Sequence, residues 1–289
     1  MKECRLYKLG GSEHIRCLAC ANKCLIKEGS VGLCGVRKNI DKKLFLLVYG
    51  KILAENVDPI EKKPIYNFLP GTYTYSIGTA GCNFKCSFCQ NFEISQLKAF
   101  SEKNVPGRKV TPDEIICRAI KSGCKSIAYT YNEPAIFAEF VKDCAMAAKK
   151  AGLKNILVSN GYLSRECFDF ISDYIDAMNI DLKSFSERFY LTYCGAKLEP
   201  VLETIKRAHE KGIHIELTTL IIPGLNDSEK ECEKIARFIS SIDKTIPWHV
   251  SRFFPMYKML DKKITPLATL EKAYKIGKKY LDYVYIGNV

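Results

Sequence analysis

From residue 72 onward, short apolar segments alternate with longer segments whose apolar residues recur at helical spacing. This alternation predicts strands and helices in turn along the chain. The predicted strands are 73–78, 126–130, 155–159, 177–181, 214–219, 248–252 and 283–286, and the predicted helices are 111–122, 134–151, 164–174, 199–211, 228–239 and one that opens at Thr265-Pro266. Because apolar strands alternating with helices build parallel sheets covered by helices, the pattern predicts an α/β fold.

Residues 1–71 have a different pattern. Two apolar runs, Leu44–Tyr49 and Lys51–Val57, meet at Gly50 and predict a β-hairpin. Proline and glycine residues then mark a linker that ends at residue 71. We therefore expect a small, cysteine-rich N-terminal β domain over residues 1–71 and a larger α/β domain over residues 72–289.

Composition limits the class of protein. The 289 residues are 47% hydrophobic and 26% charged, which is typical of a soluble globular chain. The sequence contains no run of eighteen apolar residues and does not begin with a signal-peptide pattern, so we expect a cytoplasmic protein with no membrane partner. The net charge of +12 leaves RNA open as a partner. Basic runs with interleaved aromatic residues are missing, which favours a solvated lysine-rich surface.

Fourteen cysteines in a long chain of this kind indicate metal sites together with buried thiols. Cys82, Cys86 and Cys89 follow the first predicted strand of the larger domain at the spacing C-x3-C-x2-C. A [4Fe–4S] cluster normally takes four thiolates, so three cysteines leave one iron open to a small molecule. A structural zinc site is closed by four ligands and explains this spacing poorly. The motif therefore predicts a catalytic cluster.

The segment from Thr79 to Asn91, with Phe88 before the third cysteine, resembles the signature of radical S-adenosylmethionine (SAM) enzymes. It is most similar to the branch around pyruvate formate-lyase activating enzyme and, within it, to the radical SAM component of AmmeMemoRadiSam systems. The resemblance implies a partial (β/α)6 TIM-like barrel. It also implies an oxidoreductase in which a [4Fe–4S] cluster cleaves SAM into methionine and a 5′-deoxyadenosyl radical that abstracts hydrogen from a substrate.

The resemblance also suggests partners. A reducing electron donor must supply an electron to the cluster. This branch also suggests a glycyl residue of a partner protein as the substrate. RNA or a small molecule is the alternative substrate for the same radical chemistry. A non-catalytic iron–sulfur electron carrier is the alternative from a different class of protein.

Polar residues that follow the second and third predicted strands of the barrel resemble SAM-binding segments. Glu133 matches the residue that contacts the SAM amino group, while Tyr131 and Asn132 stand where the family has glycines. Ser159 and Asn160 occupy the place of a ribose contact. The structural alternatives are a helix N-terminus at Glu133 and an ordinary Asn-Gly turn at Asn160.

The later strands carry three more candidates. Asp181 and Lys183 follow the fourth predicted strand and alternate onto one face of an extended segment. The resemblance assigns both to SAM, with Lys183 offering a cation to its carboxylate, and it assigns His249 to SAM as well. The alternatives are a structural ion pair and a core histidine.

Five further cysteines have weaker assignments. Cys17, Cys20, Cys24 and Cys34 supply four thiolates near the N-terminus and predict a second metal site, which is either structural zinc or a closed second [4Fe–4S] cluster for electron relay. Cys194 lies in the connection after the fourth predicted strand of the barrel, where barrel loops carry function, and is a catalytic candidate. A buried, unreactive thiol is the alternative for Cys194.

Overall fold

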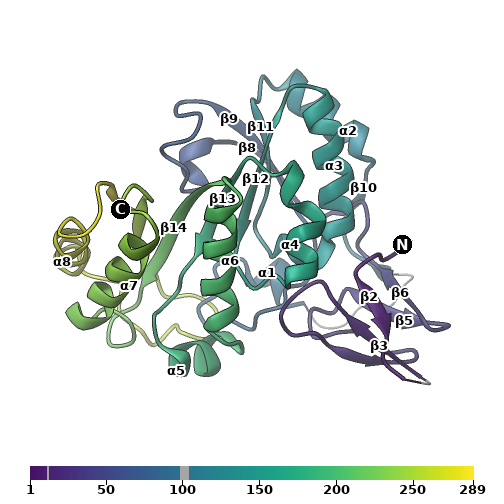
Figure 1. The fold of residues 1–289 in the computed structure, drawn as a ribbon, viewed down its shortest axis with the longest axis horizontal. Coiled ribbons are helices and arrows are strands. Elements are labelled where there is room, and N and C mark those ends of the chain that lie inside the picture. The colour runs from purple at the N-terminus through teal and green to yellow at the C-terminus, as the bar shows by residue number, and fades with distance from the viewer. Residues whose placement is uncertain (12, 98–103) are drawn as a thin grey trace.

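A computed structural model describes residues 1–11, 13–97 and 104–289 (Figure 1). Its centre is an eight-stranded sheet. In spatial order the strands are β16 (Val284–Gly287), β15 (Trp248–Arg252), β14 (His214–Ile221), β13 (Ala177–Asp181), β12 (Lys154–Ser159), β11 (Ser126–Tyr129), β9 (Tyr73–Gly78) and β8 (Ala54–Pro59). All neighbours are parallel except β8 and β9, which are antiparallel. The predicted partial TIM-like barrel is confirmed.

The longer helices pack outside the sheet, as the alternating pattern predicts, while the short α1 and α5 lie in loops at the ends of strands (Figure 1). The helices are α1 (Phe92–Ser95), α2 (Pro112–Lys121), α3 (Ala138–Lys150), α4 (Arg165–Ile171), α5 (Glu187–Phe189), α6 (Glu199–Glu210), α7 (Glu229–Ile242) and α8 (Leu267–Gly277). Helix α2 begins with a capping box between Thr111 and Glu114. None of the helices in the described part of the chain is long and apolar enough to cross a membrane.

The N-terminal region consists of short antiparallel strands: β1 (Lys2–Glu3), β2 (Tyr7–Leu9), β3 (His14–Cys17), β4 (Leu25–Lys27), β5 (Arg37–Ile40), β6 (Lys43–Leu46) and β7 (Lys51–Ile52), the last paired with β10 (Arg108–Lys109). The predicted hairpin across Gly50 is wrong. Strand β6 pairs with β5 and β1, while β8 joins the barrel beside β9. Local pattern missed this pairing because the partners of a strand depend on distant segments. The predicted boundary at residue 71 stays a prediction.

A buried ion pair fixes the N-terminal strands to the barrel. Arg37 on β5 is 1% exposed and donates to Glu139 on α3, with Nη2 to Oε2 at 2.5 Å. Its Nε also donates to the Ile136 carbonyl at 2.8 Å. Because breaking a buried pair leaves an uncompensated charge, this contact holds the two parts in a defined arrangement.

The proline-marked segment between β8 and β9 is packed inside the barrel, so its interpretation as a linker is wrong. Ile60 and Ile65 are fully buried against strand residues Ala128, Ile156 and Ala177. The Pro64 carbonyl accepts a hydrogen bond of 2.7 Å from the side chain of Asn179 on β13. Proline reports irregular backbone rather than exposure, and here that backbone closes the barrel interior.

Candidate functional site

A cavity of about 810 Å³ lies where the strands of the barrel end, with the segment before β9 forming part of its wall. It is lined by ten of the predicted residues: Cys82, Cys86, Cys89, Asn132, Glu133, Ser159, Asn160, Asp181, Lys183 and His249. Strands β9, β11, β12, β13 and β15 supply them or the segments that follow. The parallel sheet therefore brings together residues that are far apart in sequence.

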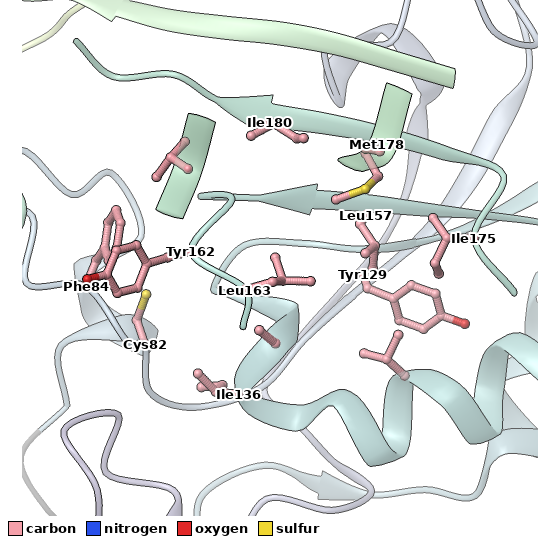
Figure 2. Packing of buried hydrophobic residues seen from close by; sticks show 14 of the residues in the cluster. Cys82, Phe84, Tyr129, Ile136, Leu157, Tyr162, Leu163, Ile175, Met178 and Ile180 are labelled. Carbon is pink, nitrogen blue, oxygen red and sulfur yellow. The ribbon is translucent and has the colours of Figure 1, made fainter. Parts of the chain in front are cut away.

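The three cysteines lie on the loop that follows β9. Cys82 is buried beside the Phe84 and Tyr162 rings, whose centroids are 5.1 Å apart (Figure 2). Burial raises the pKa of Cys82 and Cys89. Thiols that burial keeps neutral need a bound cation to become thiolates, and cluster irons supply one.

The donor set fits an iron–sulfur cluster. Three thiols face one cavity, and thiolate is the ligand that such clusters take. Asn83 adds an amide Nδ2 that is buried without a partner, while its Oδ1 accepts from Asn160 at 2.8 Å. Within the described ranges, no three His, Cys, Asp or Glu side chains converge as ligands of a single ion. Convergence is not required for a cubane, because each thiolate binds a different iron.

Glu133 is held at the end of β11 by three donors. Its carboxylate accepts from the Ala135 backbone N–H at 2.9 Å, the Ser159 hydroxyl at 3.0 Å and the Asn160 backbone N–H at 2.8 Å. Burial nevertheless raises the pKa of Glu133 to about 7. The alternative interpretations both describe the residue, since Glu133 caps the 3-10 helix Pro134–Phe137 and also faces the cavity.

The two residues that replace glycines have structural explanations. Tyr131 keeps a left-handed backbone, with φ of 68°, which glycine adopts most easily. Asn132 is buried and donates from Nδ2 to Thr79 Oγ1 at 3.0 Å and to the Gly81 carbonyl at 2.9 Å. Asn132 therefore ties the loop after β11 to the cysteine loop.

Asp181 and Lys183 form an ion pair at the end of β13. Lys183 Nζ lies 2.9 Å from Asp181 Oδ2 and 5.7 Å from the centre of the Phe88 ring on the cysteine loop. Burial opposes its charge, but Asp181 and the neighbouring thiol groups keep the pKa of Lys183 well above its usual value. The cavity thus has a permanent cation beside the cysteine loop.

His249 reaches the same level of the barrel through the strand register. Asp181 pairs with Thr218, and Thr218 pairs with His249. The imidazole is 2% exposed, and its Nε2 lies 2.6 Å from Oε2 of Glu216. His249 therefore both lines the cavity and is held by a buried carboxylate, which sequence reasoning did not identify.

Cys194 does not line the cavity. It is fully buried at the end of a π-helical turn, Tyr190–Cys194, and a hydrogen bond to Cys194 together with burial raises the pKa of Cys86. The Cys194 carbonyl accepts the Lys85 backbone N–H at 2.8 Å. Its contacts therefore support the cysteine loop, and a catalytic role stays a prediction.

The four N-terminal cysteines lie next to the cysteine loop of the barrel. The Asn22 side chain donates to the Asn83 carbonyl at 3.0 Å, and Gly81 packs so closely that an added Cβ would lie 2.4 Å from the Cys34 carbonyl oxygen. Burial raises the pKa of Cys17 to about 11 and that of Cys20 and Cys34. Among the described residues no three His, Cys, Asp or Glu side chains converge on a single ion, so these four thiols are not arranged around one metal ion. A metal here stays a prediction.

Sequence reasoning missed a group of charged residues at the edge of the cavity. Asp58, on β8, accepts from Lys63 at 2.7 Å, from Lys62 at 3.2 Å and from the Tyr131 hydroxyl at 2.9 Å. Lys63 is 3% exposed and lines the cavity. The adjacent Lys62 and Lys63, between Pro59 and Pro64, could have indicated this group, but the segment was interpreted as a linker.

Comparison with known proteins agrees with this geometry. Residues 76–239 match the family model of the radical SAM superfamily. An uncharacterized protein of Methanocaldococcus jannaschii, MJ0808, is 42% identical over all of this chain and 86% of its own length. Pyruvate formate-lyase 1-activating enzyme of Escherichia coli is 21% identical over 58% of this chain and 71% of its own. The structure of Streptococcus suis SuiB bound to precursor peptide SuiA matches 73% of this chain and 47% of the SuiB chain, with 15% identity and a TM-score of 0.55.

The chain therefore belongs to the radical SAM superfamily. The resemblance inferred from the cysteine motif is confirmed, including its likeness to activating enzymes. Membership implies an enzyme that binds SAM and a [4Fe–4S] cluster and uses radical chemistry.

Proposed function

We propose that this protein cleaves SAM reductively at a [4Fe–4S] cluster held by Cys82, Cys86 and Cys89. The bound cluster and SAM together supply the 5′-deoxyadenosyl radical, which takes a hydrogen atom from the substrate. The observation that carries the proposal is the single cavity shared by the three thiols, the Glu133 carboxylate and the Lys183 cation.

Each polar residue has a role in this proposal. Glu133 accepts hydrogen bonds from the SAM amino group, and Lys183 binds the SAM carboxylate. Asp181 holds the Lys183 ammonium in place, as its distance of 2.9 Å supports. Ser159 and Asn160 contact the ribose, and His249 also contacts SAM. Buried side chains with fixed partners favour such roles, because they are already oriented before the cofactor binds.

We propose a glycyl residue of a partner protein as the first candidate substrate. Support comes from the likeness to pyruvate formate-lyase 1-activating enzyme, whose name describes action on a protein. A small molecule is the second candidate. The packed segment around Ile60 and Ile65 favours it, because this segment closes the barrel interior and limits the room beside SAM.

The N-terminal cysteines are proposed as a second metal site. Structural zinc and a second [4Fe–4S] cluster both remain candidates, with zinc ahead; a cluster there would relay electrons, a role that the contact between Asn22 and the cysteine loop supports. The small N-terminal strands favour structural zinc, since small folds often need a metal to be stable.

The experiment is anaerobic reconstitution with iron and sulfide, followed by dithionite and SAM. The wild-type protein is expected to form methionine and 5′-deoxyadenosine, and Cys86→Ala is expected to form neither. Cys117→Ala is the matched control, because Cys117 is exposed on α2 and away from the cavity. Undiminished SAM cleavage by Cys86→Ala would refute the proposal. Candidate partner proteins are then added, and a glycyl radical signal identifies the first substrate class.

A further inference from the structure

We infer that Lys63 forms an imine with a small 2-oxo acid in the cavity. The inference deepens the proposed function, since it names the class of small molecule that this cavity would hold. It starts from the position of Lys63, whose side chain is 4% exposed yet borders the same cavity as the cysteines and Lys183. A lysine buried at a cavity wall is the usual setting for covalent attachment of a carbonyl compound.

The surroundings of Lys63 make loss of its proton easier than for a solvated lysine, although the ammonium is paired with Asp58. Burial lowers its pKa, and the adjacent Lys62 cation lowers it further, although Asp58 opposes both. Desolvation and a neighbouring cation are the two means by which proteins activate a lysine amine. Lys63 differs in this from Lys183, whose pKa is held well above its usual value.

When Lys63 loses its proton, the Asp58 carboxylate keeps other partners and is not left as an unpaired buried anion. Lys62 binds its Oδ1 at 3.2 Å, while Lys63 and the Tyr131 hydroxyl bind its Oδ2 at 2.7 and 2.9 Å. Lys62 and Tyr131 therefore still satisfy the carboxylate when Lys63 is neutral. The Tyr131 ring, centred 4.5 Å from Lys63 Nζ, stabilises the cation that returns when the imine is protonated.

Lys62 indicates the acid group of the ligand. Its side chain is 71% exposed and also borders the cavity, so it can turn from Asp58 to a ligand carboxylate next to the reacting carbonyl. In the reaction the Lys63 nitrogen bonds to the carbonyl carbon. The carbonyl oxygen leaves as water with the two hydrogens of the neutral amine, and no electrons are transferred. The protonated imine can then pair with Asp58 as the ammonium did.

The test is reductive trapping on the reconstituted protein at pH 7. Pyruvate and sodium cyanoborohydride are added without SAM, and modified lysines are mapped by peptide mass spectrometry. Acetone, which has the same ketone but no carboxylate, is the matched probe. We expect the pyruvate adduct to appear on Lys63 before any other lysine, and to appear there more slowly with acetone.

Two variants separate the possible causes. Lys63→Arg keeps the ion pair with Asp58 but cannot condense, so it should give no adduct at this position. Lys62→Met should slow trapping about tenfold for each unit by which the pKa of Lys63 recovers. Trapping spread evenly over the lysines, or equal trapping of pyruvate and acetone at Lys63, would overturn the inference. Formation of 5′-deoxyadenosine is assayed separately, so its failure refutes the proposed function without affecting the trapping result.

Discussion

Glu216 forms a buried pair with His249, which lines the cavity, with 2.6 Å between Oε2 and Nε2. The other carboxylate oxygen accepts from His214 at 3.0 Å and from the backbone N–H groups of Tyr66 and Asn67 at 2.9 and 2.7 Å. One fully buried side chain on β14 thus joins β15 to the segment that closes the barrel. The positions of His249 and Tyr66 at the cavity wall depend on this carboxylate.

This arrangement predicts a pH-dependent stability. Burial alone would raise the pKa of Glu216, but its hydrogen bonds lower it from 4.5 to about 2. A carboxylate with a lowered pKa stabilises the fold above pH 4.5, and its contribution is lost as the pH falls towards 2. Glu216→Gln should therefore cost about 3 kcal/mol at pH 7, and the cost should shrink below pH 4.5. Urea unfolding of both proteins across this range measures it, and a pH-independent difference would contradict it.

Lys183 gives a prediction for SAM binding. Lys183→Ala should weaken equilibrium binding of SAM by about 10- to 100-fold, because it removes a hydrogen bond between charged groups worth about 1.5–3 kcal/mol. The iron content should stay unchanged, because the cysteines hold the cluster and Lys183 does not. Lys206→Ala, on the exposed face of α6, is the control. A loss of iron in parallel with SAM binding would assign Lys183 to cluster assembly instead.

The N-terminal cysteines predict a second metal that survives loss of the first. A protein with Cys82, Cys86 and Cys89 all changed to alanine should still purify with metal bound. Retained zinc identifies a structural site, and iron with sulfide identifies a relay cluster. Changing Cys20 and Cys24 to alanine in that background should remove the remaining metal. Absence of any metal from the triple variant would reject both assignments.

The barrel could be predicted from sequence because its information is local. Strands such as Ala177–Asp181 are short apolar runs, and each is followed by a helix with a clear apolar face. The positions of Glu133, Asp181 and Lys183 follow, since residues after parallel strands meet at one edge. Cys82 needed only its spacing from Cys86 and Cys89.

The parts that escaped prediction depend on distant contacts. Strand β8 pairs with β9 rather than with its apparent hairpin partner, and nothing near Ala54–Pro59 in the sequence shows this. Glu216 lies in an apolar strand, and its structural role is visible only from its hydrogen bonds to residues on other segments. From the sequence Lys63 is expected to be a solvated charge, but in the folded barrel it is buried. Buried polar groups depend on tertiary partners, which single-sequence patterns do not contain.

The central claim is that the cavity holds a cluster with one iron open to SAM. The most direct measurement is the electron paramagnetic resonance spectrum of the dithionite-reduced, reconstituted protein before and after addition of SAM. We predict a [4Fe–4S] signal that changes when SAM binds the open iron, and the same signal without that change in Lys183→Ala at low SAM concentration. A cluster signal that saturating SAM leaves unchanged would contradict the account.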